Sequence, residues 1–351
     1  MSDHDTGAAR PRLSGLYRYP VKGLSPEPLE RATLFPGAAL PFDRAYAIEN
    51  GPGPFDPSAP SHLPKIHFVM LMRNEQLAAL KTQFDDATHT LTIRTGGAAA
   101  AQGLNHRLLS PTDPRGHTVT TRANRNTASG SGSGHAASSY AAAHPDTRGH
   151  IMAAPGSRAT AGSGSIATGG NTMAERDSGT TLDTPIAAEG DLGTASGRAA
   201  IEAFIAAYMG PALRGAPRVV TAPGHSFSDV PPKCLHIINL ESVRTLETLI
   251  GAKLNPLRFR PNLIVDGLPA WSEFDLIGKT LRVGAATLEI FQRTERCAAT
   301  NVDPETGARD LKIPSFLSRT LGHADFGVYA KVVGGGEVQV GDGVVACKAA
   351  A

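Results

Sequence analysis

Residues 286–307 read ATLEIFQRTERCAATNVDPETG, a strand-like run that leads into a cysteine and then into a turn. Residues 286–294 have the composition of a β-strand. The stretch 303–307, Asp-Pro-Glu-Thr-Gly, is typical of a turn and defines the exit of the loop after the cysteine. Arg296 places a cation beside the Cys297 thiol, a setting in which reactive cysteines occur. Taken alone, however, a single cysteine is more often a small buried apolar residue.

The same alternation of strands and turns extends on both sides of this loop. We expect strands at 217–222, 234–240, 262–267, 279–284, 326–333 and 337–341, and helices at 198–209, 241–251 and 313–321. Asn239 is a suitable N-cap for the second helix, and Gly251 is a suitable stop. Strands dominate and turns recur about every ten residues. The pattern predicts a β-barrel-like α+β domain over 197–345, with flanking helices.

The N-terminal part of the chain predicts a second, smaller domain. Short apolar runs at 13–21, 29–35, 43–49, 67–72 and 89–95 are bounded by Pro and Gly and are typical of strands. Leu77, Leu80 and Phe84 recur at spacings of three and four, which predicts a short helix over 74–84. We therefore expect a small, mostly-β domain over 12–122, and the fold class of the whole chain is α+β, mostly β.

A segment of very different composition separates the two domains. After Phe84 the next aromatic residues are Tyr140 and Phe204, and about two thirds of residues 121–200 are Gly, Ala, Ser or Thr. Such a segment buries too little apolar surface to offset the conformational entropy lost on ordering. We therefore expect 123–196 to be a disordered insertion.

Composition and charge exclude several classes of protein. With 34 Lys and Arg against 32 Asp and Glu, the net charge is only +2, so nothing indicates a nucleic-acid partner. No apolar run approaches the roughly 20 residues that span a bilayer, so no membrane partner is expected. The first residues lack the apolar core of a signal peptide, and the three cysteines cannot form a disulfide scaffold. A cytoplasmic location is the expectation.

Several separated motifs together resemble a known family. The pattern R-C-x-x-T-x-V-D-P-x-T-G around Cys297 resembles the cysteine loop of MOSC domains, and most closely that of the mitochondrial amidoxime-reducing component and its bacterial relatives. Further motifs of that group are F-R-P-N at 259–262, F-G-V-Y at 326–329, V-G-D at 340–342, Y-P-V-K-G at 19–23 and D-R at 43–44. The last two resemble the MOSC N-terminal β-barrel domain. The resemblance covers nearly all of the chain outside the insertion and the extreme ends.

The resemblance implies a site for molybdenum cofactor (molybdopterin), with Cys297 as catalytic residue and metal ligand. The cofactor carries an anionic phosphate and a pterin with many hydrogen-bonding groups. Arginine can donate two parallel hydrogen bonds to such groups, and lysine can supply a compact positive charge. A thiolate suits the soft metal. The residues that the resemblance assigns to cofactor binding are Lys22, Gly23, Arg44, Asn239, Arg260, Asn262, Thr300 and Tyr329. Gly23 could contribute only its backbone.

Three interpretations of the activity remain open. The first is a molybdenum-dependent oxidoreductase that reduces a small N-hydroxylated or related N–O substrate by two electrons. The second is a sulfur carrier with a persulfide on Cys297, although the chain has no pyridoxal-phosphate desulfurase domain to make that persulfide. The third is a non-catalytic carrier of molybdenum cofactor. The accompanying N-terminal barrel favours the reductase, because standalone MOSC modules usually lack it.

The reductase interpretation implies a protein partner. Three cysteines cannot supply the four thiolates of an ordinary iron–sulfur cluster. Gly278-Lys279-Thr280 lacks the upstream glycine of a P-loop, and Gly334–Gly336 opens no helix, so no nucleotide fingerprint is found. We therefore expect electrons to come from a separate electron-donor protein.

Overall fold

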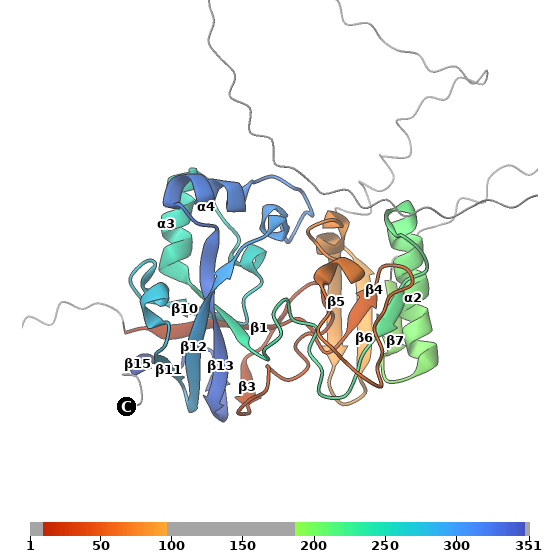
Figure 1. Cartoon of the computed structure of the whole chain (residues 1–351), viewed down its shortest axis with the longest axis horizontal. Coiled ribbons are helices and arrows are strands. Elements are labelled where there is room, and N and C mark those ends of the chain that lie inside the picture. The colour runs from red at the N-terminus through yellow and green to blue at the C-terminus, as the bar shows by residue number, and fades with distance from the viewer. Residues whose placement is uncertain (1–9, 97–186, 348–351) are drawn as a thin grey trace, which may run out of the picture. The chain divides into compact units, whose positions relative to one another are not determined.

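The computed structural model describes residues 10–96 and 187–347, which form strands with three α-helices and several 3-10 turns (Figure 1). An eight-stranded sheet has the order β15-β11-β12-β13-β9-β10-β1-β2. The strands are β15 (Val344–Cys347), β11 (Thr280–Val283), β12 (Ala286–Glu295), β13 (Asp325–Gly334), β9 (Leu235–Asn239), β10 (Leu263–Asp266), β1 (Arg12–Arg18) and β2 (Glu27–Pro28). All neighbouring strands are antiparallel except β9 and β10. The expected α+β, mostly-β fold is confirmed.

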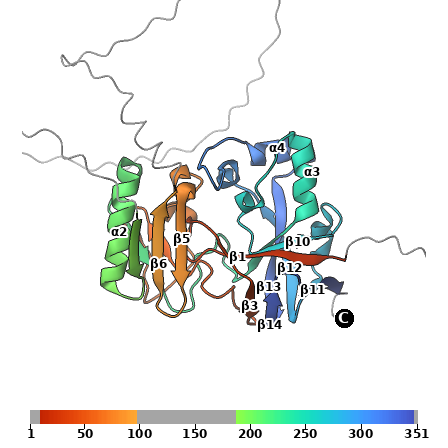
Figure 2. The same ribbon diagram turned by 180° about the vertical axis from the view of Figure 1, so that it is seen from behind.

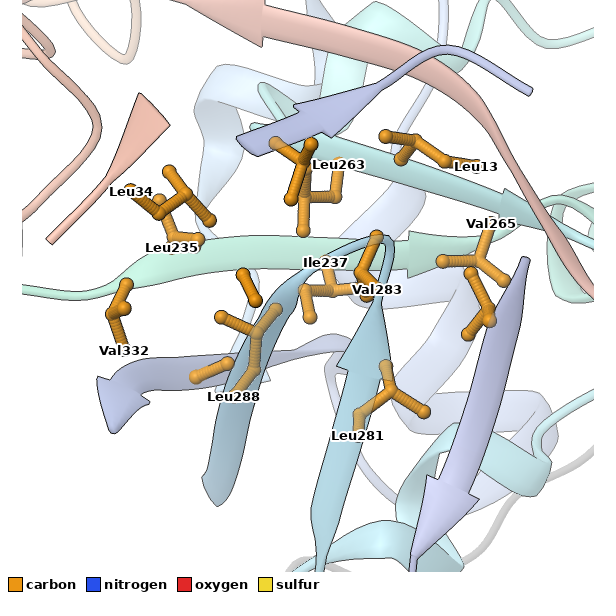
Figure 3. Packing of buried hydrophobic residues seen from close by; sticks show 14 of the residues in the cluster. Leu13, Leu34, Leu235, Ile237, Leu263, Val265, Leu281, Val283, Leu288 and Val332 are labelled. Atoms are coloured by element: carbon orange, nitrogen blue, oxygen red, sulfur yellow. The ribbon is translucent and has the colours of Figure 1, made fainter. Parts of the chain in front are cut away.

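One face of this sheet carries the largest hydrophobic core. Alternate residues along the strands, among them Leu281, Leu288 and Leu263, are almost completely buried and pack together (Figure 3). β1 is part of this arrangement, since Leu13 and Leu16 belong to the same core. The first strand of the N-terminal half thus completes the sheet of the C-terminal half, because β10 would otherwise be an unpaired edge.

Two helices pack near each other against the other face of the sheet (Figure 2). They are α3 (Leu240–Ile250) and α4 (Ile313–Leu321). The Asn239 side chain accepts a hydrogen bond from the Glu241 amide at the start of α3, and Gly251 ends the helix at φ 76°. Both expected helices and both expected caps of α3 are therefore confirmed.

The N-terminal half has its own small sheets. β5 (Leu80–Asp85), β6 (Thr90–Thr95) and β7 (Ala187–Asp191) form one, and α2 (Ala195–Met209) packs against it (Figure 1). β4 (Ala47–Glu49) pairs with β8 (Arg218–Val220) in another. A further two-stranded sheet joins β3 (Arg31–Leu34) to β14 (Gly336–Gln339) and contributes Leu34 and Val338 to the core of the eight-stranded sheet.

Two expected elements in this half are wrong. Residues 74–84 do not form one helix: Glu75–Ala79 is a 3-10 turn, and β5 begins at Leu80. Leu80 and Phe84 share a buried face of the strand, because a spacing of four residues is compatible with period 2 as well as with period 3.6. Residues 67–72 form no strand either, since only the isolated bridge between Phe68 and Glu49 pairs them.

The expected domain limits also need correction. Residues 187–196, expected in the insertion, form β7 and the start of α2. β7 is ordered because it pairs with β6, and α2 buries Ile201, Phe204 and Ile205 in the core that includes Val21 and Leu24. The helix that we expected in the second domain therefore packs on the first. The expected limit at residue 122 and the rest of the insertion lie outside the described residues.

Within those described ranges, no helix combines the length and apolarity that a membrane span requires.

Candidate functional site

The centre of the site is the ring of Tyr19, which lies just after β1. The guanidinium carbons of Arg44 and Arg260 lie 4.7 Å and 4.2 Å from its centroid. Both arginines have left-handed backbones, at φ 54° and 52°, a strained conformation that occurs preferentially at functional sites. The Tyr19 hydroxyl is fully buried and has no hydrogen-bond partner among the described residues. Burial also raises the pKa of Tyr19, so the hydroxyl stays protonated.

Lys22 approaches this centre from the loop that follows Tyr19. It is buried, and its ammonium donates to the Phe227 carbonyl oxygen at 2.8 Å and to the Asp229 carboxylate. Burial lowers the pKa of Lys22, and the nearby charges of Arg44 and Arg260 lower it further, although Asp229 opposes them. Burial also acts to raise the pKa of Asp229, but the pairing with Lys22 holds it well below its usual range.

Gly23 makes the turn after Lys22 possible. Its φ is +87°, and a Cβ atom there would lie 2.9 Å from the Val69 carbonyl oxygen. A side chain at this position would therefore be excluded both by backbone strain and by close packing.

A second group of side chains extends the site toward β9 and β13. The Arg296 guanidinium donates to the Phe259 carbonyl oxygen at 2.7 Å and lies 3.3 Å from His236 Nε2. His236 Nδ1 lies 3.3 Å from the Arg260 carbonyl oxygen, so Nδ1 carries the proton and Nε2 accepts. Burial and the Arg296 charge lower the pKa of His236 well below its usual value, which keeps the ring neutral. Arg296 Nε has no hydrogen-bond partner among the described residues.

Tyr329 on β13 lies beside this group. Its ring centroid is 5.5 Å from that of His236, and burial raises its pKa to about 12 despite the opposing charge of Arg296. The charges of Arg44 and Asp229 also reach Tyr329, so the two groups form one electrostatic cluster. We call this cluster the cationic site; its charged members among the described residues are Lys22, Arg44, Arg260 and Arg296, with Asp43 and Asp229. Four cations against two carboxylates leave an excess of positive charge suited to an anionic ligand.

Cys297 lies at the edge of the cationic site. It follows β12 and precedes the 3-10 turn Ala298–Asn301, is partly buried, and lies within electrostatic range of Arg296. Thr300, assigned to cofactor binding above, is fully buried, and its hydroxyl donates to the Cys297 carbonyl oxygen at 3.0 Å. In this structure Thr300 shapes the loop.

Arg258 holds the cysteine loop, residues 297–310, through two of its carboxylates. This side chain is 2% exposed and donates to Asp303 at 2.8 Å and to both oxygens of Asp310 at 2.8 and 2.6 Å. It also reaches the Asn301 carbonyl oxygen at 3.4 Å. Arg258 was not singled out from the sequence, although it belongs to the run LRFRPN that includes Arg260.

Two of the residues expected in the site have other partners. Asn239 caps α3 and donates to the Pro269 carbonyl oxygen at 2.7 Å and to Glu273 at 3.0 Å. Asn262 accepts from the His236 amide at 3.0 Å and donates to the Tyr17 carbonyl oxygen at 3.1 Å. The structure thus brings together Lys22, Arg44, Arg260, Tyr329 and Cys297, and adds Tyr19, Asp229, His236 and Arg296, which sequence reasoning did not assign to the site. Tyr19 lies in the motif Y-P-V-K-G and Arg296 lies in the motif around Cys297, whereas no motif in the sequence includes His236.

No group of three or more His, Cys, Asp or Glu side chains within 10–96 and 187–347 is placed to hold a metal ion. Cys234 is buried, and burial raises the pKa of its thiol to about 12.

Comparison with known proteins identifies two domains in this chain. The MOSC N-terminal beta barrel domain matches residues 10–143, and the MOSC domain matches residues 224–345. Mitochondrial amidoxime reducing component 2 of Rattus norvegicus is 32% identical over 127 residues, 32% of this chain and 37% of that protein. Mitochondrial amidoxime-reducing component 1 of Homo sapiens is 27% identical over 131 residues, 34% and 38% of the two chains. The match thus spans little more than a third of these relatives.

Among solved structures, YiiM from Geobacillus stearothermophilus is similar at 18% identity and a TM-score of 0.27, over 32% of this chain and 54% of that one. The MOSC N-terminal beta barrel match contains Tyr19, Lys22, Asp43 and Arg44 of the site. The MOSC match contains the other residues of the site, Asp229, His236, Arg260, Arg296, Cys297 and Tyr329. The chain therefore carries a MOSC domain preceded by a MOSC N-terminal β-barrel domain.

Proposed function

We propose that this protein binds molybdenum cofactor and reduces small N-hydroxylated or related N–O substrates, using electrons from a separate protein. The observation that carries the proposal is the cationic site beside Cys297. It combines an excess of positive charge, two buried polar groups without partners among the described residues and a thiol at its edge. The names of the curated relatives, which are amidoxime-reducing components, support the choice of substrate class.

The residues present suit such a cofactor. Buried polar atoms in folded proteins nearly always have partners, so the Tyr19 hydroxyl and Arg296 Nε, which lack one among the described residues, would suit a ligand with acceptor atoms. Lys22, Arg44 and Arg260 would hold a phosphate, and Arg296 would reach other oxygen or nitrogen acceptors. Cys297 would supply a thiolate to a soft metal.

When bound, the cofactor would supply a two-electron redox centre that accepts an oxygen atom from the substrate. The protein would orient the substrate and control protons. Tyr329, with its raised pKa, stays a hydrogen-bond donor at neutral pH. Neutral His236 holds its proton on Nδ1 and presents Nε2 to Arg296, which keeps that guanidinium in place.

The deciding experiment measures molybdenum and pterin in the purified protein and follows reduction of an N-hydroxylated amidine. Turnover is expected with a reduced viologen dye and not with NADH alone. Cys297→Ser should keep the fold and retain pterin but lose turnover. Cys347→Ser is the matched control, because Cys347 is also free and partly exposed but lies on β15.

Four results would contradict the proposal. Full turnover by Cys297→Ser would remove the role of the thiol. Steady NADH-driven turnover by the chain alone would remove the separate donor. Sulfane sulfur on Cys297 in a protein without molybdenum would favour a sulfur carrier, and bound cofactor without turnover would favour a non-catalytic carrier.

A further inference from the structure

Arg309 joins the start of the cysteine loop to the N-terminal half of the chain. Arg309 Nη1 donates to the Ala298 carbonyl oxygen at 3.0 Å, on the residue next to Cys297. Its Nη2 faces the other way and donates to the Met72 carbonyl oxygen at 3.1 Å and to Glu75 at 3.0 Å, with the Leu71 carbonyl oxygen at 3.4 Å. A single planar group therefore connects the start of the loop with the segment 71–75.

The local fold of the loop brings Arg309 into this position. The Asp303 amide donates to the Ala308 carbonyl oxygen at 2.8 Å, and Val302 forms an antiparallel bridge with Arg309. The chain thus doubles back after the turn at 303–307, so residue 309 lies beside the beginning of the loop. Asp310, the next residue, is tied to Arg258. The backbone on either side of Arg309 is thereby fixed.

The kind of side chain is important here. Arg309 addresses acceptors on both sides with one rigid fork, whereas a lysine offers a single flexible ammonium. Its partners are mainly backbone carbonyl oxygens, so the guanidinium holds the backbone of the cysteine loop in a fixed position relative to the segment 71–75. A shift of the Ala298 peptide would move the neighbouring Cys297, and displacements of about 1 Å can cost about 100-fold in rate.

We propose that Arg309 is a positioning residue that sets the place of the Cys297 thiol by tying the cysteine loop to the N-terminal half. The inference rests on the proposed function, in which Cys297 is the metal ligand. It gives the N-terminal half a second role. Besides contributing Lys22 and Arg44 to the cationic site, this half holds the loop that carries the thiol.

A second contact between the same two regions provides a matched control. Lys81 donates to the Pro304 carbonyl oxygen at 3.2 Å and to Glu305 at 2.8 Å, at the far turn of the loop. Its side chain is 44% exposed and that of Glu305 is 62% exposed. Such exposed ion pairs contribute little by themselves, and this holds for Arg309 and Glu75 too, which are 33% and 44% exposed. The two contacts differ because Arg309 also bonds the Ala298 peptide beside Cys297, whereas Lys81 bonds only the far turn of the loop.

The test compares Arg309→Met, Arg309→Lys, Glu75→Gln and Lys81→Met. In protein loaded with cofactor and reduced by dye, Arg309→Met should lower kcat by about 10- to 100-fold while KM changes less than about twofold, because only the position of the reacting centre is lost. Arg309→Lys should recover part of kcat, Glu75→Gln should have a smaller effect of the same sign, and Lys81→Met should match wild type.

A second measurement needs neither cofactor nor activity. The rate of Cys297 alkylation by iodoacetamide is measured in cofactor-free protein carrying Cys347→Ser, with the modified peptide identified by mass spectrometry. Arg309→Met should raise this rate by roughly threefold or more, because a loosened loop opens more often. Lys81→Met should leave it unchanged.

The two arms separate the inference from the function on which it rests. If wild type contains no molybdenum, the proposed function fails, and the alkylation rate still decides the role of Arg309. Unchanged kcat and unchanged alkylation in Arg309→Met would overturn the inference. If Arg309→Met does not fold, Arg309→Lys and Glu75→Gln decide: wild-type values for both would also overturn it.

Discussion

Replacing Arg258 by methionine is the sharpest test of how the cysteine loop is held. Methionine keeps an unbranched apolar stem but is shorter, and it removes the charge and all hydrogen bonds to Asp303, Asp310 and the Asn301 carbonyl oxygen. Removing one member of a fully buried ion pair costs about 3–5 kcal/mol, because the other charge is left unpaired. Here Asp303 is 21% exposed and Asp310 is 45% exposed, so water can solvate both in part. In the variant, Asp303 would still accept hydrogen bonds from the backbone amides of Glu305 and Thr306. We therefore expect a loss of about 2–3 kcal/mol.

The assay is urea unfolding of cofactor-free protein, with the free energy of unfolding taken from the midpoint and slope. Arg244→Met is the matched control, because Arg244 also contacts two carboxylates, Glu241 and Asp266, but its side chain is 48% exposed. The control should lose less than about 1 kcal/mol. A loss below about 1 kcal/mol in Arg258→Met, or equal losses in both variants, would refute the reasoning from burial.

The same variant carries a prediction about pH. Burial acts to raise the pKa of Asp303, but the amides of Thr306 and Glu305 and the charge of Arg258 lower it overall. A carboxyl with a lowered pKa stabilises the fold above its unfolded pKa, about 3.9, and this contribution is lost as pH falls through the lowered value. The difference between wild type and Arg258→Met should therefore be full at about pH 7 and shrink below about pH 4.

Further predictions concern the cationic site and the domain limits. Tyr19→Phe removes a buried hydroxyl that has no partner among the described residues, so the cofactor-free protein should keep its stability or gain up to about 1 kcal/mol in urea, while phosphate binding measured by calorimetry weakens; a clear loss of stability would contradict this. Gly23→Ala should cost about 1–2 kcal/mol more than Gly37→Ala, because both have positive φ but only the first meets a backbone oxygen, at 2.9 Å; equal costs would show that the close contact is unimportant. Replacing 123–186 by a Gly/Ser linker should preserve soluble protein and its melting temperature, whereas replacing 123–196 should lose both because β7 and the start of α2 are removed; equal behaviour of the two deletions would contradict the pairing of β7 with β6.

Local sequence determined the elements whose signals are local. The strand before Cys297, the turn after it, and α3 with its Asn239 and Gly251 caps all follow from residues within a few positions of one another. The family motifs identified both domains, and they led to the four residues Lys22, Arg44, Arg260 and Tyr329 that the structure brings together with Cys297.

Tertiary structure alone decided the features that depend on a distant partner. Leu80 and Phe84 satisfy a helix and a strand equally well, and pairing with β6 selects the strand. β7 has a composition close to that of the insertion, and it is a strand because a neighbouring edge is available. Asn239 and Asn262 are polar residues near site motifs, yet their hydrogen bonds go to a helix end and to backbone groups. A side chain's type limits which bonds it can form, but only the folded chain determines which partner lies within about 3 Å, and that partner decides whether the group is free to bind a ligand.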